Sequence, residues 1–555
     1  MPTKGKNDGI RLVITPFSLP YLIFFLLLQF NKRMILSIPK GRGGEKAAAE
    51  GGSAKTKTAM ASLKSLAKDT AIYGLSSIVG RFLNYLLVPL YTAKMSAESG
   101  GYGVITNMYA YTALLLVILT YGMETTFFRY VNKTEENPQT VYSTVLMSVG
   151  ATAALFIALV FAFLPQIATF MKYPDHQSWV AVMFVCVAID AFKCIPFAYL
   201  RYQKKALKFA ALQLVNIILN IVLNLLYLLV LPALRLNPFG LYDEHFTVDV
   251  GMVFYINLVC TAVVLACFWK ELTGFRWRFD VKLWRRMLRY AWPLLVLGIA
   301  GILNQTLDKI IFPYLYEGTD EKTQLGIYGA ATKIAMIMAM ITQAFRYAYE
   351  PFVFGKSKDK DNRETYAKAM KFFIIFTLLA FLVVIAYLDV LRYIIPNESY
   401  WPGLRVVPIV MAAEIMMGIY FNLSFWYKLI DKTIYGAWFS AAGCVVLVAV
   451  NVIFVPRYSY MACAWGGVAG YGTAMVLSYL VGQKKYPIAY QLKSIGVYVA
   501  IAALFYFCMN YSNGHLPKLF ALAVNTILVL AFVAHIVYHD LPLKSLPVVG
   551  KYFRK

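Results

Sequence analysis

The stretch GIAGILNQTLDKIIFP, Gly298–Pro313, repeats an earlier stretch, GLSSIVGRFLNYLLVP, Gly74–Pro89, without a gap. Each is followed by a short loop and then by a Tyr-Gly pair, at Tyr102 and at Tyr328. Six helices between the repeats would return the chain to the side of a membrane on which it started. The repeat therefore predicts two lobes of the same orientation, related by an axis along the membrane normal.

Composition places the whole chain in a membrane. Hydrophobic residues make up 60% of the sequence and charged residues only 15%, against roughly 45–50% and about 25% in soluble proteins. The apolar residues form blocks of roughly 20, the length a helix needs to cross the hydrocarbon core. The blocks lie near 68–91, 103–125, 140–165, 178–200, 208–233, 249–269, 290–315, 326–347, 370–390, 403–427, 434–455, 461–482, 492–511 and 517–538. We predict an all-α integral membrane protein of about 14 transmembrane helices, in two six-helix lobes plus two C-terminal helices.

These blocks divide the chain into five segments. They are an atypical N-terminal extension (1–59), an N-lobe with helices 1–6 (60–280), a C-lobe with helices 7–12 (281–485), helices 13–14 (486–540) and a tail (541–555). Three alternatives stand for the extension: an extra helix, an uncleaved signal-like segment, or sequence upstream of a true start at Met60. We favour the last, because residues 60–64, MASLK, begin a plausible amphipathic entry to the first helix.

The loops predict the orientation. If the N-terminal side is cytoplasmic, the cytoplasmic loops and tail hold roughly 29 Lys and Arg against about 8 on the other side, a strong positive-inside bias. The densest loops are Lys270–Arg289 and Arg346–Lys371. We expect a bacterial inner (cell) membrane with both termini cytoplasmic. The same bias accounts for most of the net charge of +25, which indicates contact with anionic membrane lipids and not with nucleic acid.

The sequence offers no catalytic or metal-binding motif. The seven cysteines are scattered without a CxxC pair, and the five histidines form no HExxH. No phosphate-binding GxxxxGK[ST] run and no nucleophile elbow occurs. We therefore expect no enzymatic activity, no cofactor and no metal centre. A transport cycle would use an ion gradient, H+ or Na+, the membrane potential, or the gradient of the substrate itself.

Polar residues inside the apolar blocks are the candidate substrate-binding residues. An ionisable side chain at the centre of a spanning helix costs about 2.5–3.5 kcal/mol, so it normally faces a partner or a watery cavity. The candidates are Arg81, Asn84, Asp190, Lys193, Asn304, Asp308, Lys309, Lys333 and Glu414. Two simpler interpretations stay open. Asp190 and Lys193, spaced i,i+3, could form a self-neutralising pair, and the stripe Asn216, Asn220 and Asn224 could only bond neighbouring helices.

Several stretches resemble a known family in their order and spacing. They are LAKDTAIYGLSSIVGRFLNYLLVPLY (Leu66–Tyr91), IPFAYLRYQKKALKFAALQLVNIILNIVLNL (Ile195–Leu225), the pair LNQTLDKIIFPYLY and LGIYGAATKIAMI within Leu303–Ile337, and LSFWYKLIDKTIYGAWFSAAG (Leu423–Gly443). Over roughly residues 62–540 the chain resembles the polysaccharide flippases of the multidrug/oligosaccharidyl-lipid/polysaccharide exporter superfamily. The resemblance implies translocation of undecaprenyl-pyrophosphate-linked oligosaccharide repeat units from the cytoplasmic to the periplasmic leaflet, for lipopolysaccharide or another surface polysaccharide. Its partners would be this lipid-linked substrate, membrane lipids and polysaccharide assembly proteins.

Other functions remain open on the sequence. Within the same superfamily they are a multidrug/cation antiporter, which acidic residues such as Asp308 and Glu414 would suit, and a flippase for the peptidoglycan precursor. A membrane-embedded polysaccharide polymerase belongs to a different class. It would need a large extracytoplasmic loop, and the longest here, Pro232–Val248, is short.

Overall fold

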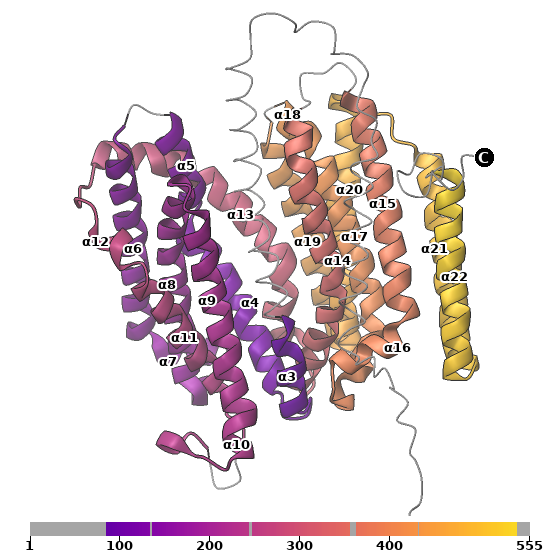
Figure 1. Cartoon of the computed structure of the whole chain (residues 1–555), viewed down its shortest axis with the longest axis horizontal. Helices are drawn as coiled ribbons and strands as arrows, with labels where there is room; N and C mark the ends of the chain where they lie inside the picture. Colours follow the sequence, from indigo (N-terminus) through magenta and orange to yellow (C-terminus); the bar gives the residue numbers. More distant parts are fainter. Residues whose placement is uncertain (1–84, 134–135, 243–246, 356–361, 431, 541–555) are drawn as a thin grey trace, which may run out of the picture. The chain divides into compact units, whose positions relative to one another are not determined.

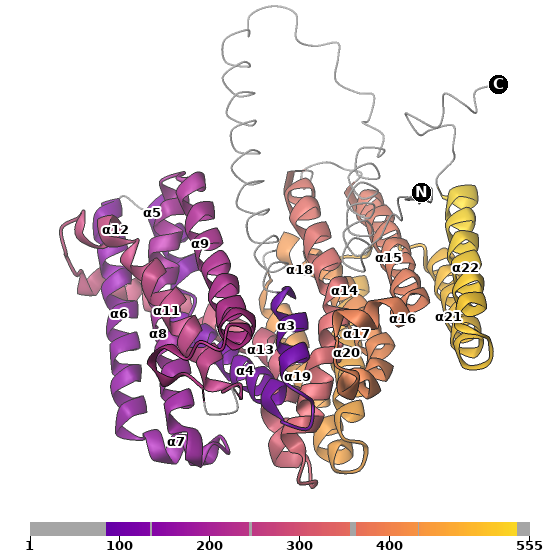
Figure 2. The same ribbon diagram turned by 60° about the horizontal axis from the view of Figure 1, so that its bottom comes forward.

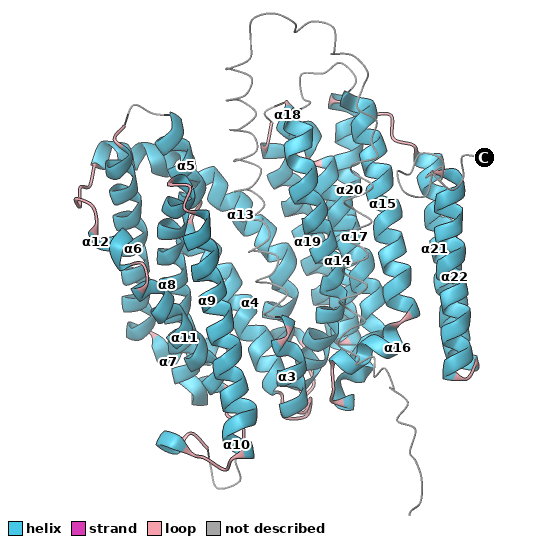
Figure 3. Ribbon diagram, in the orientation of Figure 1, coloured by secondary structure: helices cyan, strands magenta, loops and turns pink. Residues whose placement is uncertain are grey.

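A computed structural model describes residues 85–133, 136–242, 247–355, 362–430 and 432–540. All regular elements in these residues are helices, with no strand (Figure 3). The all-α prediction is thus confirmed for the described part of the chain. The N-terminal extension, most of the first apolar block with Arg81 and Asn84, and the tail lie outside the described residues.

The main helices correspond to the predicted blocks. In chain order they are α3 (Leu87–Lys94), α4 (Gly101–Thr120), α5 (Met123–Lys133), α6 (Pro138–Ala162), α7 (Leu164–Phe170), α8 (Gln177–Tyr202), α9 (Ala206–Leu225), α11 (Gly251–Ala266), α12 (Trp269–Thr273), α13 (Val281–Leu315), α14 (Glu321–Gly355), α15 (Asn362–Ala386), α16 (Leu388–Leu391), α17 (Val407–Leu423), α18 (Phe425–Leu429), α19 (Ile434–Tyr458), α20 (Tyr460–Lys485), α21 (Leu492–His515) and α22 (Lys518–His539). A short α10 (Leu231–Ala233) follows α9, and a 3₁₀ segment, η5 (Glu398–Val406), precedes α17. Helices α13, α14 and α15 extend beyond their predicted blocks.

Eleven helices in the described residues are long and apolar enough to cross a membrane. Two more predicted blocks are helical but fall outside that set. Helix α11 has only 16 residues, and the 26-residue α20 is rich in glycine, which lowers its mean hydropathy. Since the first block lies mostly outside the described residues, the count of about 14 stays a prediction.

The chain divides into two compact units, of which the smaller contains α21 and α22 together with residues 378–394. Within it, Asn525 on α22 donates a hydrogen bond of 3.3 Å to the backbone oxygen of Ala386. The hydroxyl groups of Tyr387 and Thr526 lie 3.1 Å apart. These contacts hold α22 to the end of α15 and the start of α16. The lobe boundaries proposed from the sequence stay predictions.

The larger unit contains two groups of helices that share α4 and α13 (Figure 1, Figure 2). In the first group α8 packs against α4, α6 and α11, and α9 packs against α11. In the second, α20 packs against α17 and α19, and α14 packs against α17. Helix α4 contacts both α13 and α14. The described helices that correspond to the two predicted lobes therefore meet along α4 and α13.

Helix α13 belongs to the first group at its beginning and to the second at its end. Leu283, Met287 and Ala291 are buried in one apolar cluster with α5 and α6. Further along, the amide of Asn304 donates to the backbone oxygen of Ser440 on α19 at 2.8 Å. Pro293 lies between the two halves and provides no backbone N–H to the helix. Helix α13 therefore links the two groups, and its side chains are in contact with both.

Glycines permit the close crossing of α4 and α14. A Cβ atom on Gly103 would lie 1.8 Å from the backbone oxygen of Lys322, and one on Gly329 would lie 2.3 Å from the hydroxyl of Thr106. These glycines are the second members of the two Tyr-Gly pairs that follow the sequence repeat. Small residues let membrane helices approach this closely, so the repeat positions make the contact between the two groups.

Candidate functional site

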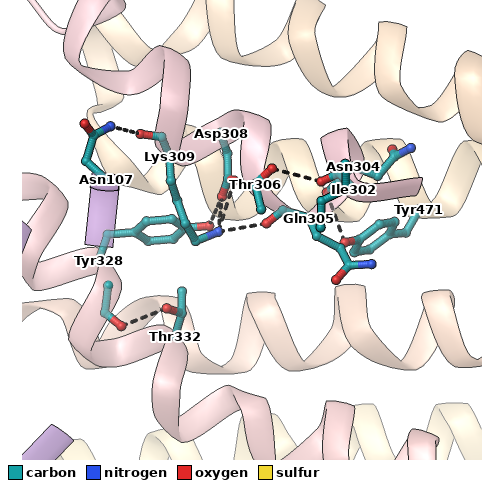
Figure 4. A network of polar contacts seen from close by, with 11 residues as sticks. Asn107, Ile302, Asn304, Gln305, Thr306, Asp308, Lys309, Tyr328, Thr332 and Tyr471 are labelled. Atoms are coloured by element: carbon teal, nitrogen blue, oxygen red, sulfur yellow. Dashed lines mark hydrogen bonds and ion pairs between the residues drawn. The ribbon is translucent and has the colours of Figure 1, made fainter. Parts of the chain in front are cut away.

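Asp308 and Lys309 form the centre of a polar network on α13 (Figure 4). The Lys309 ammonium lies 2.9 and 3.0 Å from the two carboxylate oxygens of Asp308 and donates a longer bond to the backbone oxygen of Gln305. The hydroxyl of Tyr328 on α14 donates to the same carboxylate at 2.8 Å. Asp308 is only 6% exposed. The pair is therefore neutral as a whole and well satisfied, so an apolar helix can tolerate it.

Asn107 connects this network to the first helix group. Its side-chain amide on α4 donates to the backbone oxygen of Lys309 at 2.8 Å, and its side-chain oxygen accepts a bond of 3.0 Å from the hydroxyl of Tyr173. Nearby, the ammonium of Lys172 donates to the backbone oxygen of Pro313. Both groups of helices are thus hydrogen-bonded to the end of α13.

Asn304 lies one turn before Asp308 and is incompletely bonded. Its amide donates to the backbone oxygens of Ala300 and Ser440, both at 2.8 Å. Its side-chain oxygen is buried and has no hydrogen-bond partner among the described residues. The hydroxyl of Tyr471 on α20 donates to the backbone oxygen of Asn304 at 3.0 Å. A buried acceptor without a partner is available to a hydrogen-bond donor that enters from outside the chain.

Lys333 on α14 lies in a first cavity of about 310 Å³. Helices of both groups line it, and three tyrosines and three asparagines provide its polar surface: Tyr91, Tyr102, Tyr109, Asn216, Asn220 and Asn257. No acidic side chain of the described residues lines the cavity. One ammonium, surrounded by hydroxyl and amide groups, suits an anionic group attached to a polar, hydroxylated body.

Glu414 on α17 lies in a second cavity of about 230 Å³. Gln305, Gln343, Arg346 and Tyr471 share the lining. Among the described residues Glu414 makes no ion pair.

Asp190 and Lys193 form a closed arrangement elsewhere in the first group. The Lys193 ammonium lies 2.7 Å from Asp190 and donates to the hydroxyl of Thr261 on α11 at 2.8 Å. That hydroxyl donates in turn to Asp190 at 2.6 Å. Neither charged residue lines the two cavities. This geometry favours the interpretation as a self-neutralising pair that fastens α8 to α11.

The predicted site residues therefore fall into several places. The structure brings Asn304, Asp308 and Lys309 together, and places Lys333 and Glu414 in two separate cavities; Arg81 and Asn84 lie outside the described residues. The asparagine stripe serves both expected roles: Asn216 and Asn220 line the first cavity, whereas Asn224 accepts a 3.0 Å bond from Tyr91.

Sequence reasoning missed the aromatic lining of the first cavity and the bridging role of Asn107. Tyr102 carried a signal, because it opens one of the two Tyr-Gly pairs. Tyr91, Tyr109 and Asn257 had none, since a tyrosine or a single asparagine in an apolar block is as common in helix packing as in a site.

Comparisons with solved structures agree on the fold. The chain is similar to the lipid II flippase MurJ in an inward closed conformation, with a TM-score of 0.66, 13% identity, and coverage of 84% of this chain and 98% of that one. It is also similar to a multidrug resistance MATE family transporter of the MOP superfamily in an inward-facing conformation, with a TM-score of 0.59, 14% identity, and coverage of 72% and 93%. For the MATE multidrug transporter DinF-BH the TM-score is 0.54, with 14% identity and coverage of 76% and 96%.

Sequence comparison identifies the family. No curated protein sequence matches the chain significantly. The sequence profile described as polysaccharide biosynthesis protein matches residues 66–348, which is just over half of the chain. The apolar helices and the transporter fold make the protein a multi-pass membrane protein. The chain belongs to the polysaccharide biosynthesis protein family and has the fold of the MOP-type flippases and transporters.

Proposed function

We propose that the protein moves a lipid-linked oligosaccharide, carried on undecaprenyl pyrophosphate, from the cytoplasmic to the periplasmic leaflet of the bacterial inner membrane. A pyrophosphate with hydrated sugars cannot cross hydrocarbon unaided, because each unsatisfied polar group costs several kcal/mol there. Transport requires no covalent chemistry from the protein, only a polar path for the headgroup. The lipid tail would remain in the bilayer.

The first cavity is the observation that carries this proposal. Lys333, the one cation among its described lining residues, suits a phosphate oxygen, and its tyrosine and asparagine side chains suit sugar hydroxyls. The cavity is lined by helices of both groups, so a change in the distance between the groups would change access to it. Its volume of about 310 Å³ accommodates part of a headgroup, so passage of a whole repeat unit would require the groups to separate.

Contacts at one end of the helix groups indicate how access would be controlled. The backbone N–H of Ala97 donates to the Ser399 hydroxyl at 2.9 Å, and the hydroxyl of Tyr400 on η5 donates to the backbone oxygen of Met95 at 2.9 Å. In the orientation expected from the positive-inside bias, this is the periplasmic end. The protein would then be closed to the periplasm, with both termini in the cytoplasm, and would release its substrate after these contacts break.

The experiment is depletion of the protein in its native host, followed by isolation of lipid-linked repeat units. We expect complete units to accumulate in the cytoplasmic leaflet, where an impermeant reagent added outside cannot modify them, and surface polymer to fall. Accumulation of unpolymerised units in the periplasmic leaflet would contradict the proposal and support a polymerase. Accumulation of the peptidoglycan precursor would instead assign the protein to that pathway.

Glu414 supports a second candidate, cation-coupled antiport of H+ or Na+. A carboxylate that lines a cavity without an ion-pair partner among the described residues is suited to bind a cation or a proton. The cation could drive flipping or the export of cationic drugs. In proteoliposomes with an imposed H+ or Na+ gradient, Glu414→Gln would then abolish the dependence of transport on the gradient. Equal gradient dependence in the variant and the original protein would contradict a coupling role.

A further inference from the structure

The segment Trp269–Trp292, formed by α12 and the first part of α13, carries a concentration of positive charge outside both cavities. We call it the basic platform. Its seven cations are Lys270, Arg276, Arg278, Lys282, Arg285, Arg286 and Arg289. Its two carboxylates have structural partners. Glu271 is bound by Lys208 at 2.7 Å, and Asp280 accepts the backbone N–H of Leu283 at 2.9 Å as the N-cap of α13. Most of the positive charge is therefore left uncompensated.

The backbone of the platform is fixed to the first helix group. The N–H of Arg278 donates to the hydroxyl of Ser143 on α6 at 2.8 Å, and the indole of Trp284 donates to the hydroxyl of Ser148 at 2.8 Å. The rings of Phe275 and Tyr142 lie 4.9 Å apart in an edge-to-face arrangement. A basic loop that served only to orient the chain during insertion would not need such fixed positions.

The cationic side chains point away from this attachment. Arg276, Arg278, Lys282 and Arg285 are all exposed, and none of them forms an ion pair within the described residues. Arg286 differs, because it pairs with Glu136. Large aromatic rings are exposed beside them: Trp269 is 70%, Trp277 54% and Trp292 66% exposed. Helix α13 begins within this region at Val281 and continues beyond it into a stretch long and apolar enough to cross a membrane.

We propose that the basic platform binds the anionic phospholipid headgroups of the leaflet that it faces. Tryptophan rings are favourable at the level of the headgroups, and arginine and lysine beside a membrane are attracted to acidic lipids. Exposed guanidinium groups at fixed positions can bind phosphate oxygens with paired N–H donors. Headgroup binding would hold the beginning of α13 at the membrane surface, and the end of the same helix carries Asp308 and Lys309. The lipid composition of the leaflet would then affect transport through the position of α13.

The test is lipid binding by the purified full chain, stripped of lipid in a neutral detergent. Native mass spectrometry would count bound phosphatidylglycerol and, in parallel, bound phosphatidylcholine. The test variant is R276Q/R278Q/K282Q/R285Q. The matched control, K204Q/K205Q/K484Q/K485Q, removes the same charge from four exposed lysines elsewhere, two in the loop before α9 and two at the end of α20. Unchanged thermal unfolding verifies that both variants fold.

We expect the platform variant to bind phosphatidylglycerol at least about tenfold more weakly and the control to stay within about twofold. Added salt should weaken binding to the original protein and have little effect on the platform variant, because salt screens exposed charges. An equal loss of phosphatidylglycerol binding in both variants would mean that only the net charge matters. Unchanged binding by the platform variant would exclude the platform as a lipid-binding site. Salt-sensitive binding of an acidic protein or of nucleic acid, with no preference for phosphatidylglycerol, would also overturn the proposal.

Discussion

The side-chain amide of Asn107 on α4 donates a 2.8 Å hydrogen bond to the backbone oxygen of Lys309 on α13. The two residues lie 202 positions apart, and Asn107 is 1% exposed. Because α4 packs against α14 as well as α13, this bond lies where the two helix groups meet. Lys309 also pairs with Asp308, so a local movement that breaks the bond to Asn107 would disturb the charged centre of the site.

Asn107→Leu should destabilise the protein by about 1–3 kcal/mol, because it leaves the backbone oxygen of Lys309 and the hydroxyl of Tyr173 without partners in a buried place. Tyr173→Phe removes only one of the two bonds and should cost less. Thermal unfolding in detergent should rank the original protein as the most stable, Tyr173→Phe second and Asn107→Leu last. Equal stability of Asn107→Leu and the original protein would show that the bond is dispensable.

Gly103→Ala should impair folding, since the new Cβ would lie 1.8 Å from the backbone oxygen of Lys322 and would force α4 and α14 apart. Overpacking of this kind costs about 1–3 kcal/mol. Gly301→Ala is the matched control, because no heavy atom beyond its own stretch of helix lies within 4 Å of its added Cβ; its stability should be unchanged or slightly higher. The amount of folded protein in the membrane is measured for both variants. An amount for Gly103→Ala equal to that of the original protein would argue against the close crossing of α4 and α14.

The pair Asp190 and Lys193 on α8, bonded to Thr261 on α11, can distinguish a structural role of buried charges from a role in transport. Asp190→Asn leaves the Lys193 ammonium, which is 5% exposed, without its counter-charge, and we expect a loss of about 3–5 kcal/mol. The double variant Asp190→Asn with Lys193→Gln removes both charges and should recover most of the stability and full transport. Recovery of stability without recovery of transport would assign the pair to the transport path.

Asp280, the N-cap of α13, makes the stability of the fold depend on pH. The backbone N–H of Leu283 donates to its carboxylate and lowers its pKa, and the neighbouring cations Arg286 and Arg278 contribute in the same direction. A lowered pKa means that Asp280 stabilises the fold at neutral pH, and that this stabilisation is lost as the pH falls through the folded-state pKa. The unfolding temperature of Asp280→Ala should therefore be lower than that of the original protein at neutral pH, with the difference disappearing in acid below that pKa. A difference that persists in acid would exclude the ionised cap.

Helix positions could be predicted because the length of an apolar block directly reflects the thickness of the membrane. The last block, 517–538, nearly coincides with α22 (Lys518–His539). Several helices extend beyond their blocks, and α13 is the clearest case: the block 290–315 missed its first nine residues, because α13 starts at Val281. Those residues are basic and partly exposed. A search for apolar blocks therefore does not detect the part of a helix that extends beyond the hydrocarbon core. The N-cap Asp280 was the signal for the true start.

Candidate residues could be predicted one helix at a time, but their partners could not. A charged residue in an apolar block shows that a polar environment must exist, and this pointed to Asp308 and Lys333 alike. The hydrogen bond from Tyr328 to Asp308 and the separation of Lys333 into its own cavity depend on how distant helices pack. One sequence without its three-dimensional contacts contains no pattern from which those neighbours follow.

Flipping by the purified protein tests the central claim most directly. The assay follows the movement of a fluorescent undecaprenyl-pyrophosphate oligosaccharide between the leaflets of proteoliposomes that contain the original protein, Lys333→Gln or the exposed control Lys205→Gln. The account predicts movement by the original protein and by Lys205→Gln. It predicts an initial rate about 10- to 100-fold lower for Lys333→Gln, because a hydrogen bond to a charged group contributes about 1.5–3 kcal/mol. No movement by the original protein, or an equal rate for Lys333→Gln, would contradict it.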